Sequence, residues 1–154
     1  MRQWLSPGRV GNAATRIARR TKPSADGRGT AVKRALLVED HAVFREALAA
    51  MLEEHTDLEK TVHARSLPEA RRIWGQTTGE VDLVIVDLDL PSGEGISLID
   101  NLRETEPDVP VLALTNARNL EQRACALRAG ADEVLSTASS VDKIVGVVQR
   151  LVGG

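Results

Sequence analysis

The sequence predicts a five-stranded, doubly wound parallel α/β sheet in three layers, and three observations support this fold class. Short apolar runs recur along residues 35–154. Stretches in which apolar residues follow helical spacing separate these runs, and polar or turn-forming residues end each one. Such strict alternation of short buried strands with helices is typical of a parallel sheet that helices cover on both faces.

The clearest strand is Leu83–Val86, which leads directly into Asp87. A short apolar run with polar residues at its ends predicts a strand that is buried on both faces. Pro91 and Gly95 follow and break the strand pattern, so we expect Asp87 at the carboxyl end of the strand. In open α/β sheets, ligands bind at that edge.

The first half of the domain holds two strand–helix units. The apolar run Ala35–Val38 predicts the first strand, and a weaker strand follows at Lys60–His63. Between them, helical spacing predicts a helix with Asp40 or His41 at its cap. Its apolar residues are Val43, Phe44, Ala47, Leu48, Met51 and Leu52. A second helix is predicted over Leu67–Thr77 and ends before Gly79. Its apolar residues that should face the core are Leu67, Ala70, Ile73 and Trp74.

The second half repeats this pattern after the central strand. A helix near Gly95–Glu104 precedes the strand Val111–Leu114, and the helix Leu120–Ala129 precedes the strand Glu133–Leu135. Gly130 suits a left-handed cap at the end of the fourth helix. A last helix presents an apolar face made of Val141, Ile144, Val145, Val148 and Leu151.

Residues 1–34 differ in composition from the rest of the chain. They carry nine Arg and Lys against Asp26 alone, a net charge of +8, whereas residues 35–154 carry eleven against twenty-one acids, a net charge of −10. Glycines and prolines with few apolar residues predict a disordered basic tail. A basic arm can bind nucleic acid or an anionic membrane. No motif accompanies the charge, so we expect a solvated tail or a start codon assigned too early.

The composition excludes several function classes. Cys125 is the only cysteine, which excludes an internal disulfide and predicts a cytoplasmic protein. No apolar run reaches membrane-spanning length, and no signal-peptide pattern opens the chain. Three aromatic residues are too few for a platform that stacks single-stranded nucleic acid. The three histidines are scattered, so we expect surface or capping roles for them.

Polar residues follow three strands whose carboxyl ends share one edge of the predicted sheet. Glu39 and Asp40 follow the first strand, Asp87 ends the third, and Thr115 ends the fourth. Converging carboxylates repel one another, and Mg²⁺, which takes oxygen ligands and is often shared with a phosphate, relieves that repulsion. A carboxylate beside this ion can attack phosphorus and form an aspartyl phosphate. The Thr115 hydroxyl could then donate a hydrogen bond to a phosphoryl oxygen.

The spacing of these residues is that of a known family. The matching positions are Glu39-Asp40, Asp87 with Pro91 and Gly95, Thr115, and Gly130-Ala131-Asp132. Together they resemble a response-regulator receiver domain of two-component signalling, over about residues 35–152. The resemblance implies a flavodoxin-like (βα)5 fold. The opening of the domain looks most like receivers that precede a helix-turn-helix output domain, but the chain stops at Gly154, so we expect no output domain.

The resemblance also implies roles for individual residues. Asp87 would be the phosphoacceptor, with a histidine kinase or phosphotransfer protein as donor. Mg²⁺ would be held by Asp40, by Glu39 through water, by Asp87 and by the backbone carbonyl of Asp89. Thr115 and Asn116 would contact the phosphoryl group. The face formed by residues 115–152 would bind an effector protein or form a homodimer. We therefore expect a signalling domain and not an enzyme.

Three positions depart from the family pattern. Receivers carry a lysine after the fifth strand that pairs with the phosphoryl group, and this chain has Thr137 there. The aromatic residue usual on the fifth strand is Val134, and the small residue usual after the threonine is Asn116. These departures leave a second hypothesis open, in which the chain is a pseudo-receiver that binds partners independently of phosphate.

Two further classes agree less well with the sequence. Asp87 and Asp89 could be the nucleophile and the acid/base of a haloacid-dehalogenase-type phosphatase, but Pro91 stands where that family needs a threonine. The later lysine and acidic pair of that family are also missing from Leu114–Leu135. A flavodoxin-like cofactor binder would need a phosphate-cradling first loop and more aromatic residues.

Overall fold

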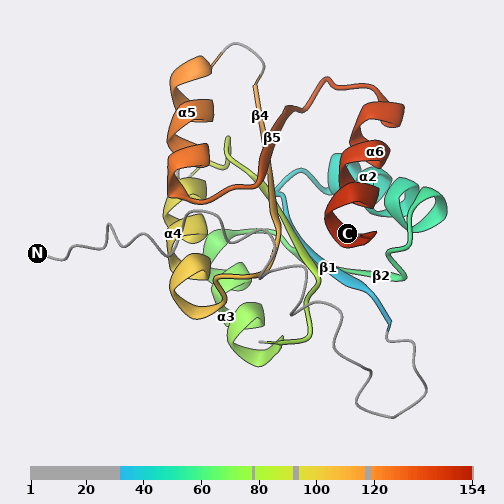
Figure 1. Cartoon of the computed structure of the whole chain (residues 1–154), viewed down its shortest axis with the longest axis horizontal. Helices are drawn as coiled ribbons and strands as arrows, with labels where there is room; N and C mark the ends of the chain where they lie inside the picture. Colours follow the sequence, from blue (N-terminus) through green and yellow to red (C-terminus); the bar gives the residue numbers. More distant parts are fainter. Residues whose placement is uncertain (1–31, 78, 92–93, 117–118, 154) are drawn as a thin grey trace, which may run out of the picture.

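The computed structural model describes residues 32–77, 79–91, 94–116 and 119–153, and it confirms the predicted fold class (Figure 1). Five parallel strands form one sheet in the order β2-β1-β3-β4-β5. The strands and helices alternate along the chain: β1 (Arg34–Val38), α2 (Ala42–His55), β2 (Lys60–Ala64), α3 (Leu67–Thr77), β3 (Leu83–Asp87), α4 (Gly95–Thr105), β4 (Val111–Thr115), α5 (Leu120–Ala129), β5 (Glu133–Ser136) and α6 (Val141–Gly153).

The predicted bounds of the strands and of helices α3 to α6 agree with the observed ones to within two residues, and α2 continues three residues beyond its last predicted apolar residue, Leu52. The predicted tail is the main exception, because Arg34 already belongs to β1 and pairs with Lys60 of β2. The rest of that segment, residues 1–31, lies outside the described residues. None of the helices in the described ranges combines the length and the apolar character that crossing a membrane would require.

The sheet forms the middle of three layers. Helices α2 and α6 cover one face, and α3, α4 and α5 cover the other (Figure 1). Every residue of β3 and β4 is buried, as the continuous apolar runs predict. Alternate residues of β3 enter two separate hydrophobic clusters, so that Val84 packs under α3–α5 while Ile85 packs under α2 and α6. The carboxyl ends of the strands are therefore held by a core on both sides.

The buried face of α2 differs from the predicted one. Its buried residues are Arg45, Leu48, Ala49 and Leu52, whereas Val43 is 83% exposed. Val43 lies in the first turn of the helix, directly after the loop that leaves β1. Arg45 occupies the inward position of this turn because it has hydrogen-bond partners there. Apolar spacing does not reveal a buried position that a charged residue occupies.

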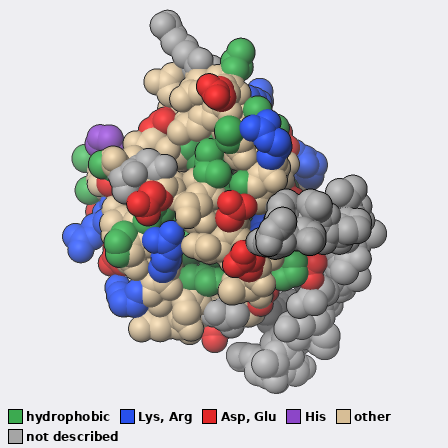
Figure 2. Space-filling view, turned by 90° about the vertical axis from the view of Figure 1, so that its left-hand side faces the viewer, with side chains coloured by type: hydrophobic (Ala, Val, Ile, Leu, Met, Phe, Trp, Pro, Cys, Tyr) green, Lys and Arg blue, Asp and Glu red, His purple; other side chains and the backbone are tan. Residues whose placement is uncertain are grey.

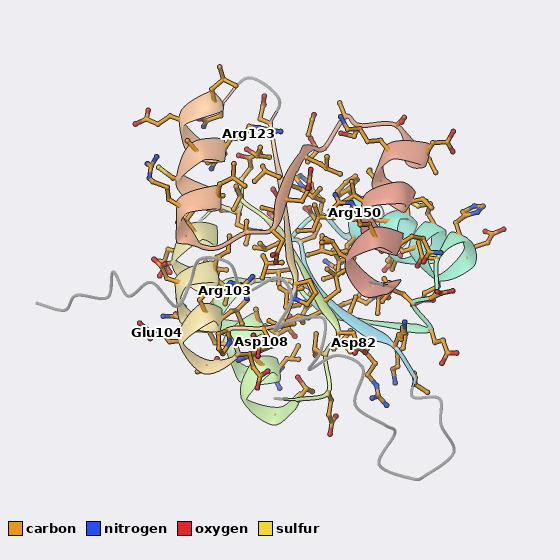
Figure 3. All side chains as sticks on the ribbon, in the orientation of Figure 1. Asp82, Arg103, Glu104, Asp108, Arg123 and Arg150 are labelled. Carbon is orange, nitrogen blue, oxygen red and sulfur yellow. The ribbon has the colours of Figure 1, made fainter. Side chains whose placement is uncertain are left out.

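A buried ion pair fixes the opposite edge of the sheet. The Arg103 guanidinium lies 2.9 Å from the Asp132 carboxylate and also donates to the carbonyl oxygens of Val109 (2.6 Å) and Gly130 (3.0 Å) (Figure 3). Gly130 caps α5 with a φ of +122°, as predicted, and a Cβ at this position would lie 2.7 Å from the Arg103 side chain. Only glycine therefore fits both the backbone and the packing here.

Candidate functional site

The carboxyl ends of β1, β3 and β4 lie side by side, as predicted. Strand β3 lies between β1 and β4, and its register pairs Val86 with Val38 and Asp87 with Leu114. Glu39, the residue after Val38, therefore lies beside Asp87, and Thr115 ends β4 one residue after Leu114. This register brings the predicted acids and the predicted hydroxyl to one place.

Glu39 and Asp87 are buried carboxyl groups that contact each other. Their exposed fractions are 1% and 7%, and their side chains share a hydrogen bond. Burial is the largest cause that raises the pKa of Asp87, and the hydrogen bond and the charge of Glu39 add to it, so that the pKa reaches about 7. The backbone N–H of Asp89, 2.8 Å from Asp87 Oδ1, opposes this shift. At neutral pH the Asp87 carboxyl is therefore protonated in about half of the molecules.

Asp40 and His41 extend this acidic group toward solvent. Glu39, Asp40 and His41 can each offer a ligand atom, and these atoms all lie within 4.8 Å of one another. His41 is the N-cap residue of α2, as predicted, but its imidazole makes no capping bond. The imidazole Nδ1 instead lies 3.4 Å from Glu39 and 3.6 Å from Asp40. This contact was not predicted from the sequence, although the adjacent acids were a signal for it.

The donor set fits a hard divalent cation. Glu39 contacts Asp87 and also belongs to the group with Asp40 and His41, so Glu39 connects Asp87 to the outer part of the acidic group. A doubly charged ion there would replace the shared proton and neutralise the carboxylates, and oxygen ligands are the ones that Mg²⁺ prefers. Asp89 contributes to this region through its N–H to Asp87.

Arg45 is a functional candidate that sequence reasoning missed. Its guanidinium is buried, donates from Nη1 to the backbone carbonyl of Glu39 at 2.8 Å, and donates from Nε to His63 Nδ1 at 3.2 Å. The first bond fixes the backbone from which the Glu39 carboxyl projects. It also places a positive charge behind the acidic group. The sequence feature that could have identified Arg45 is its position among the apolar residues of α2.

The loop after β3 is tied to the loop after β4. The exposed Asp89 carboxylate accepts a hydrogen bond from the backbone N–H of Asn116 at 2.8 Å. Asp89 therefore contacts both Asp87, through its own N–H, and Asn116, through its side chain. Gly95 allows α4 to approach this loop closely, since a Cβ there would lie 3.2 Å from the Leu88 backbone and 3.3 Å from the Asp87 carbonyl oxygen.

Thr115 lies at the predicted strand end, but α5 engages its hydroxyl. Thr115 is 1% exposed, and its Oγ1 donates to Gln122 Oε1. Gln122 Nε2 in turn donates to the carbonyl oxygen of Leu88 at 3.0 Å. Gln122 was not singled out in the sequence, where a glutamine near the start of a helix has no distinctive signal.

The atypical position on β5, Val134, and the one directly after β5, Thr137, have contrasting surroundings. Thr137 is exposed, and its backbone N–H donates to the Thr115 carbonyl oxygen at 3.0 Å, so it lies level with the end of β4. Val134 is 2% exposed and packs in the hydrophobic cluster under α3–α5. The first lysine along the chain after β5 is Lys143, in α6.

The family model of the response regulator receiver domain matches residues 35–149. The chain therefore belongs to this family, as the resemblance implied. It is a receiver domain of the response regulators of two-component systems, signalling domains that accept a phosphoryl group and bind Mg²⁺.

Curated relatives and solved structures agree with this assignment. The chain is 30% identical over 120 residues to the virulence transcriptional regulatory protein PhoP of Salmonella typhimurium (strain LT2), with 77% of this chain and 51% of the relative covered. It is 24% identical over 119 residues to a glycerol metabolism activator of Pseudomonas putida, with 77% of this chain and 53% of the relative covered. The chain thus spans about half the length of these curated relatives.

Among solved structures, a receiver domain protein from Clostridium thermocellum shares the fold at a TM-score of 0.71 and 20% identity, covering 79% of this chain and 94% of that one. A response regulator from Burkholderia pseudomallei, solved with a phosphorylated aspartic acid, a calcium ion and citrate, has a TM-score of 0.66 and 28% identity. That comparison covers 79% of this chain and 69% of the other.

Proposed function

We propose that Asp87 accepts the phosphoryl group and that Glu39, Asp40, Asp87 and the Asp89 backbone carbonyl hold Mg²⁺. The observation that carries the proposal is the hydrogen bond between the buried carboxyl groups of Glu39 and Asp87. Two buried carboxyl groups that share a proton can bind a divalent cation instead of that proton. The solved Burkholderia pseudomallei structure, which holds both a phosphorylated aspartic acid and a calcium ion, supports the assignment.

The chain's own residues prepare Asp87 for attack. The Asp89 N–H holds Oδ1 of Asp87, which fixes the plane of the carboxyl group. A carboxylate oxygen of Asp87 forms a bond to phosphorus while the bond from phosphorus to the leaving group breaks. Asp87 must be ionised to act as a nucleophile, which its pKa of about 7 opposes. Bound Mg²⁺ would supply positive charge that favours the ionised carboxylate and neutralises the phosphoryl oxygens.

The rim of the site suits a protein that donates the phosphoryl group. Val43, Leu120 and Val141 are 83%, 72% and 51% exposed, and each lies in the first turn of a helix that begins at this edge of the sheet. Exposed apolar side chains around a polar site are typical of a protein-binding surface. We propose a histidine kinase or phosphotransfer protein as the donor, which places the domain in the cytoplasm.

A second surface lies on the side of α5. Figure 2 shows the side of the molecule that carries α3, α4 and α5, where apolar, acidic and basic side chains are interspersed. Leu127 of α5 is 48% exposed. We propose that the face formed by residues 115–152 binds an effector protein or a second copy of the chain.

Binding of beryllofluoride, an analogue of a phosphoryl group, tests the proposal directly. We expect isothermal titration in the presence of Mg²⁺ to show one site in the wild type and none in Asp87→Asn. Asp142→Asn, an exposed aspartate of α6, is the matched control and should bind like the wild type. Equal absence of binding in the wild type and Asp87→Asn would contradict phosphoacceptance and leave the phosphate-independent interaction module.

A further inference from the structure

Two hydrogen-bond donors at the end of β4 are engaged by side chains that do not belong to the acidic group. The Thr115 hydroxyl donates to Gln122 Oε1, and the Asn116 N–H donates to Asp89 Oδ2 at 2.8 Å. A hydroxyl and a backbone amide have one hydrogen each. Neither group can therefore make its present bond and also donate fully to a phosphoryl oxygen on Asp87.

Gln122 joins the ends of two neighbouring strands to the start of α5. Its side chain accepts from Thr115 of β4 and donates to the carbonyl oxygen of Leu88, directly after β3, at 3.0 Å. Its backbone N–H donates at 2.9 Å to Oδ1 of Asn119, the N-cap residue of α5. The first turn of α5 is thus tied to the ends of both β3 and β4 through one residue.

Asp89 makes a second connection between the same loops. Its N–H bonds to Asp87 Oδ1 and its carboxylate bonds to the Asn116 N–H, both at 2.8 Å. Asp87 and the Asn116 amide are therefore separated by a single residue that contacts both. A phosphoryl group, with close to two negative charges, would repel the Asp89 carboxylate from this position.

We propose that Gln122 and Asp89 are positioning residues that hold Thr115 and Asn116 in the phosphate-free arrangement. This inference rests on the proposed phosphorylation of Asp87. The phosphoryl dianion is a stronger acceptor than the neutral Gln122 amide oxygen, so the Thr115 hydroxyl transfers its bond to it. Gln122 then loses its partner on β4, and the first turn of α5 loses a connection to the sheet. Phosphorylation is thereby communicated to α5 through Gln122.

The test compares Gln122→Met with the wild type in the full chain. Methionine has a similar length, but its thioether is only a weak acceptor for the Thr115 hydroxyl and cannot donate to Leu88. Because the variant has no strong hydrogen bond to break, it should bind beryllofluoride with Mg²⁺ roughly threefold to tenfold more tightly than the wild type. Gln76→Met, on the exposed side of α3, is the matched control and should bind like the wild type.

Amide hydrogen exchange is a second measurement, and it should not change in this way if Gln122 only stabilised the fold. In the wild type, beryllofluoride should speed amide exchange in the first turn of α5. In Gln122→Met that turn should exchange fast already, with no further change on binding. In a Thr115→Ala background, Gln122→Met should leave the affinity unchanged, because the hydroxyl that it restrains is absent.

Two results would have different meanings. If the wild type binds beryllofluoride, but Gln122→Met matches it in both affinity and exchange, the inference is overturned and the proposed function is retained. If the wild type binds no better than Asp87→Asn, the proposed function itself fails, and the inference fails with it.

Discussion

Glu39 follows β1 and Asp87 ends β3, and their carboxyl groups share a hydrogen bond where both are almost inaccessible to solvent. Burial, followed by the hydrogen bond and the charge of Glu39, raises the pKa of Asp87 to about 7. The acidic group is therefore a site in which protons and a divalent cation compete. This competition makes the site testable through stability as well as through phosphorylation.

Stability without metal should fall as the pH rises from about 4 to about 7 and should level off above that. The unfolded chain releases the Asp87 proton near the ordinary pKa of 3.8, whereas the folded protein retains it up to about 7. The stabilisation is thus fully present below about pH 4 and is lost as the pH rises through about 7, by at most about 1.4 kcal/mol per pH unit. Urea unfolding in a chelating buffer should show this decline.

Asp87→Asn should remove that decline, because the amide does not titrate, and should make the metal-free protein more stable than the wild type near pH 8. Mg²⁺ should stabilise the wild type at this pH and affect Asp87→Asn less. A wild-type stability that is flat across this range in chelating buffer would show that the two carboxyls do not share a proton.

Replacing Arg45 with methionine should weaken both the fold and the metal site. The change leaves the Glu39 carbonyl and His63 without their buried donor, which should cost about 1–3 kcal/mol. Loss of the restraint on the Glu39 backbone should also lower Mg²⁺ affinity, measured by titration. Arg123→Met, at an exposed position of α5 (Figure 3), is the control and should change neither quantity. Unchanged unfolding of Arg45→Met would contradict this role.

Thr137→Lys should speed phosphorylation of Asp87. Thr137 lies exposed at the end of β5 and offers only a neutral hydroxyl, whereas a lysine could make a charge-assisted bond to the phosphoryl group. We expect a gain of roughly tenfold in the rate with acetyl phosphate. Ala138→Lys adds the same charge one residue away and should gain less. Equal rates in wild type and Thr137→Lys would indicate that another cation, with Lys143 the nearest in sequence, already meets the phosphoryl group.

Deletion of residues 1–31 should leave the fold intact. This segment is rich in glycine, proline and positive charge and has few apolar residues to bury. Its removal should shift the midpoint of thermal unfolding by less than about 2 °C. A larger loss would mean that the basic segment binds the acidic domain, and lost affinity for DNA would assign it a role in nucleic-acid binding.

Much of the fold could be predicted from the sequence because burial on both faces leaves a clear pattern. Leu83–Val86 and Val111–Leu114 are continuous apolar runs, and a strand between two helical layers must be apolar on both sides. The same pattern located the end of β3, and the order of the parallel strands then brought Glu39 next to Asp87.

The remaining parts of the site depend on hydrogen bonds between residues of different strands, helices and loops. Arg45 bonds to His63, Gln122 to Thr115 and Leu88, and Asp89 to Asn116. No periodic pattern marks such pairs, because each depends on where two loops or a loop and a helix meet in three dimensions. The inward position of Arg45 shows the same limit, since a buried charge with good partners looks like a surface residue in sequence.

The most direct test of the central claim is to locate the phosphorylated residue. The full chain would be incubated with acetyl phosphate and Mg²⁺, then reduced with borohydride, which converts an aspartyl phosphate into homoserine. Tandem mass spectrometry of the peptides should find homoserine at position 87 alone, and Asp87→Asn should show none. Two results would contradict the assignment of Asp87 as the phosphoacceptor. One is homoserine at another aspartate of the wild type. The other is no homoserine in the wild type, under conditions in which Thr137→Lys is labelled at a position other than 87.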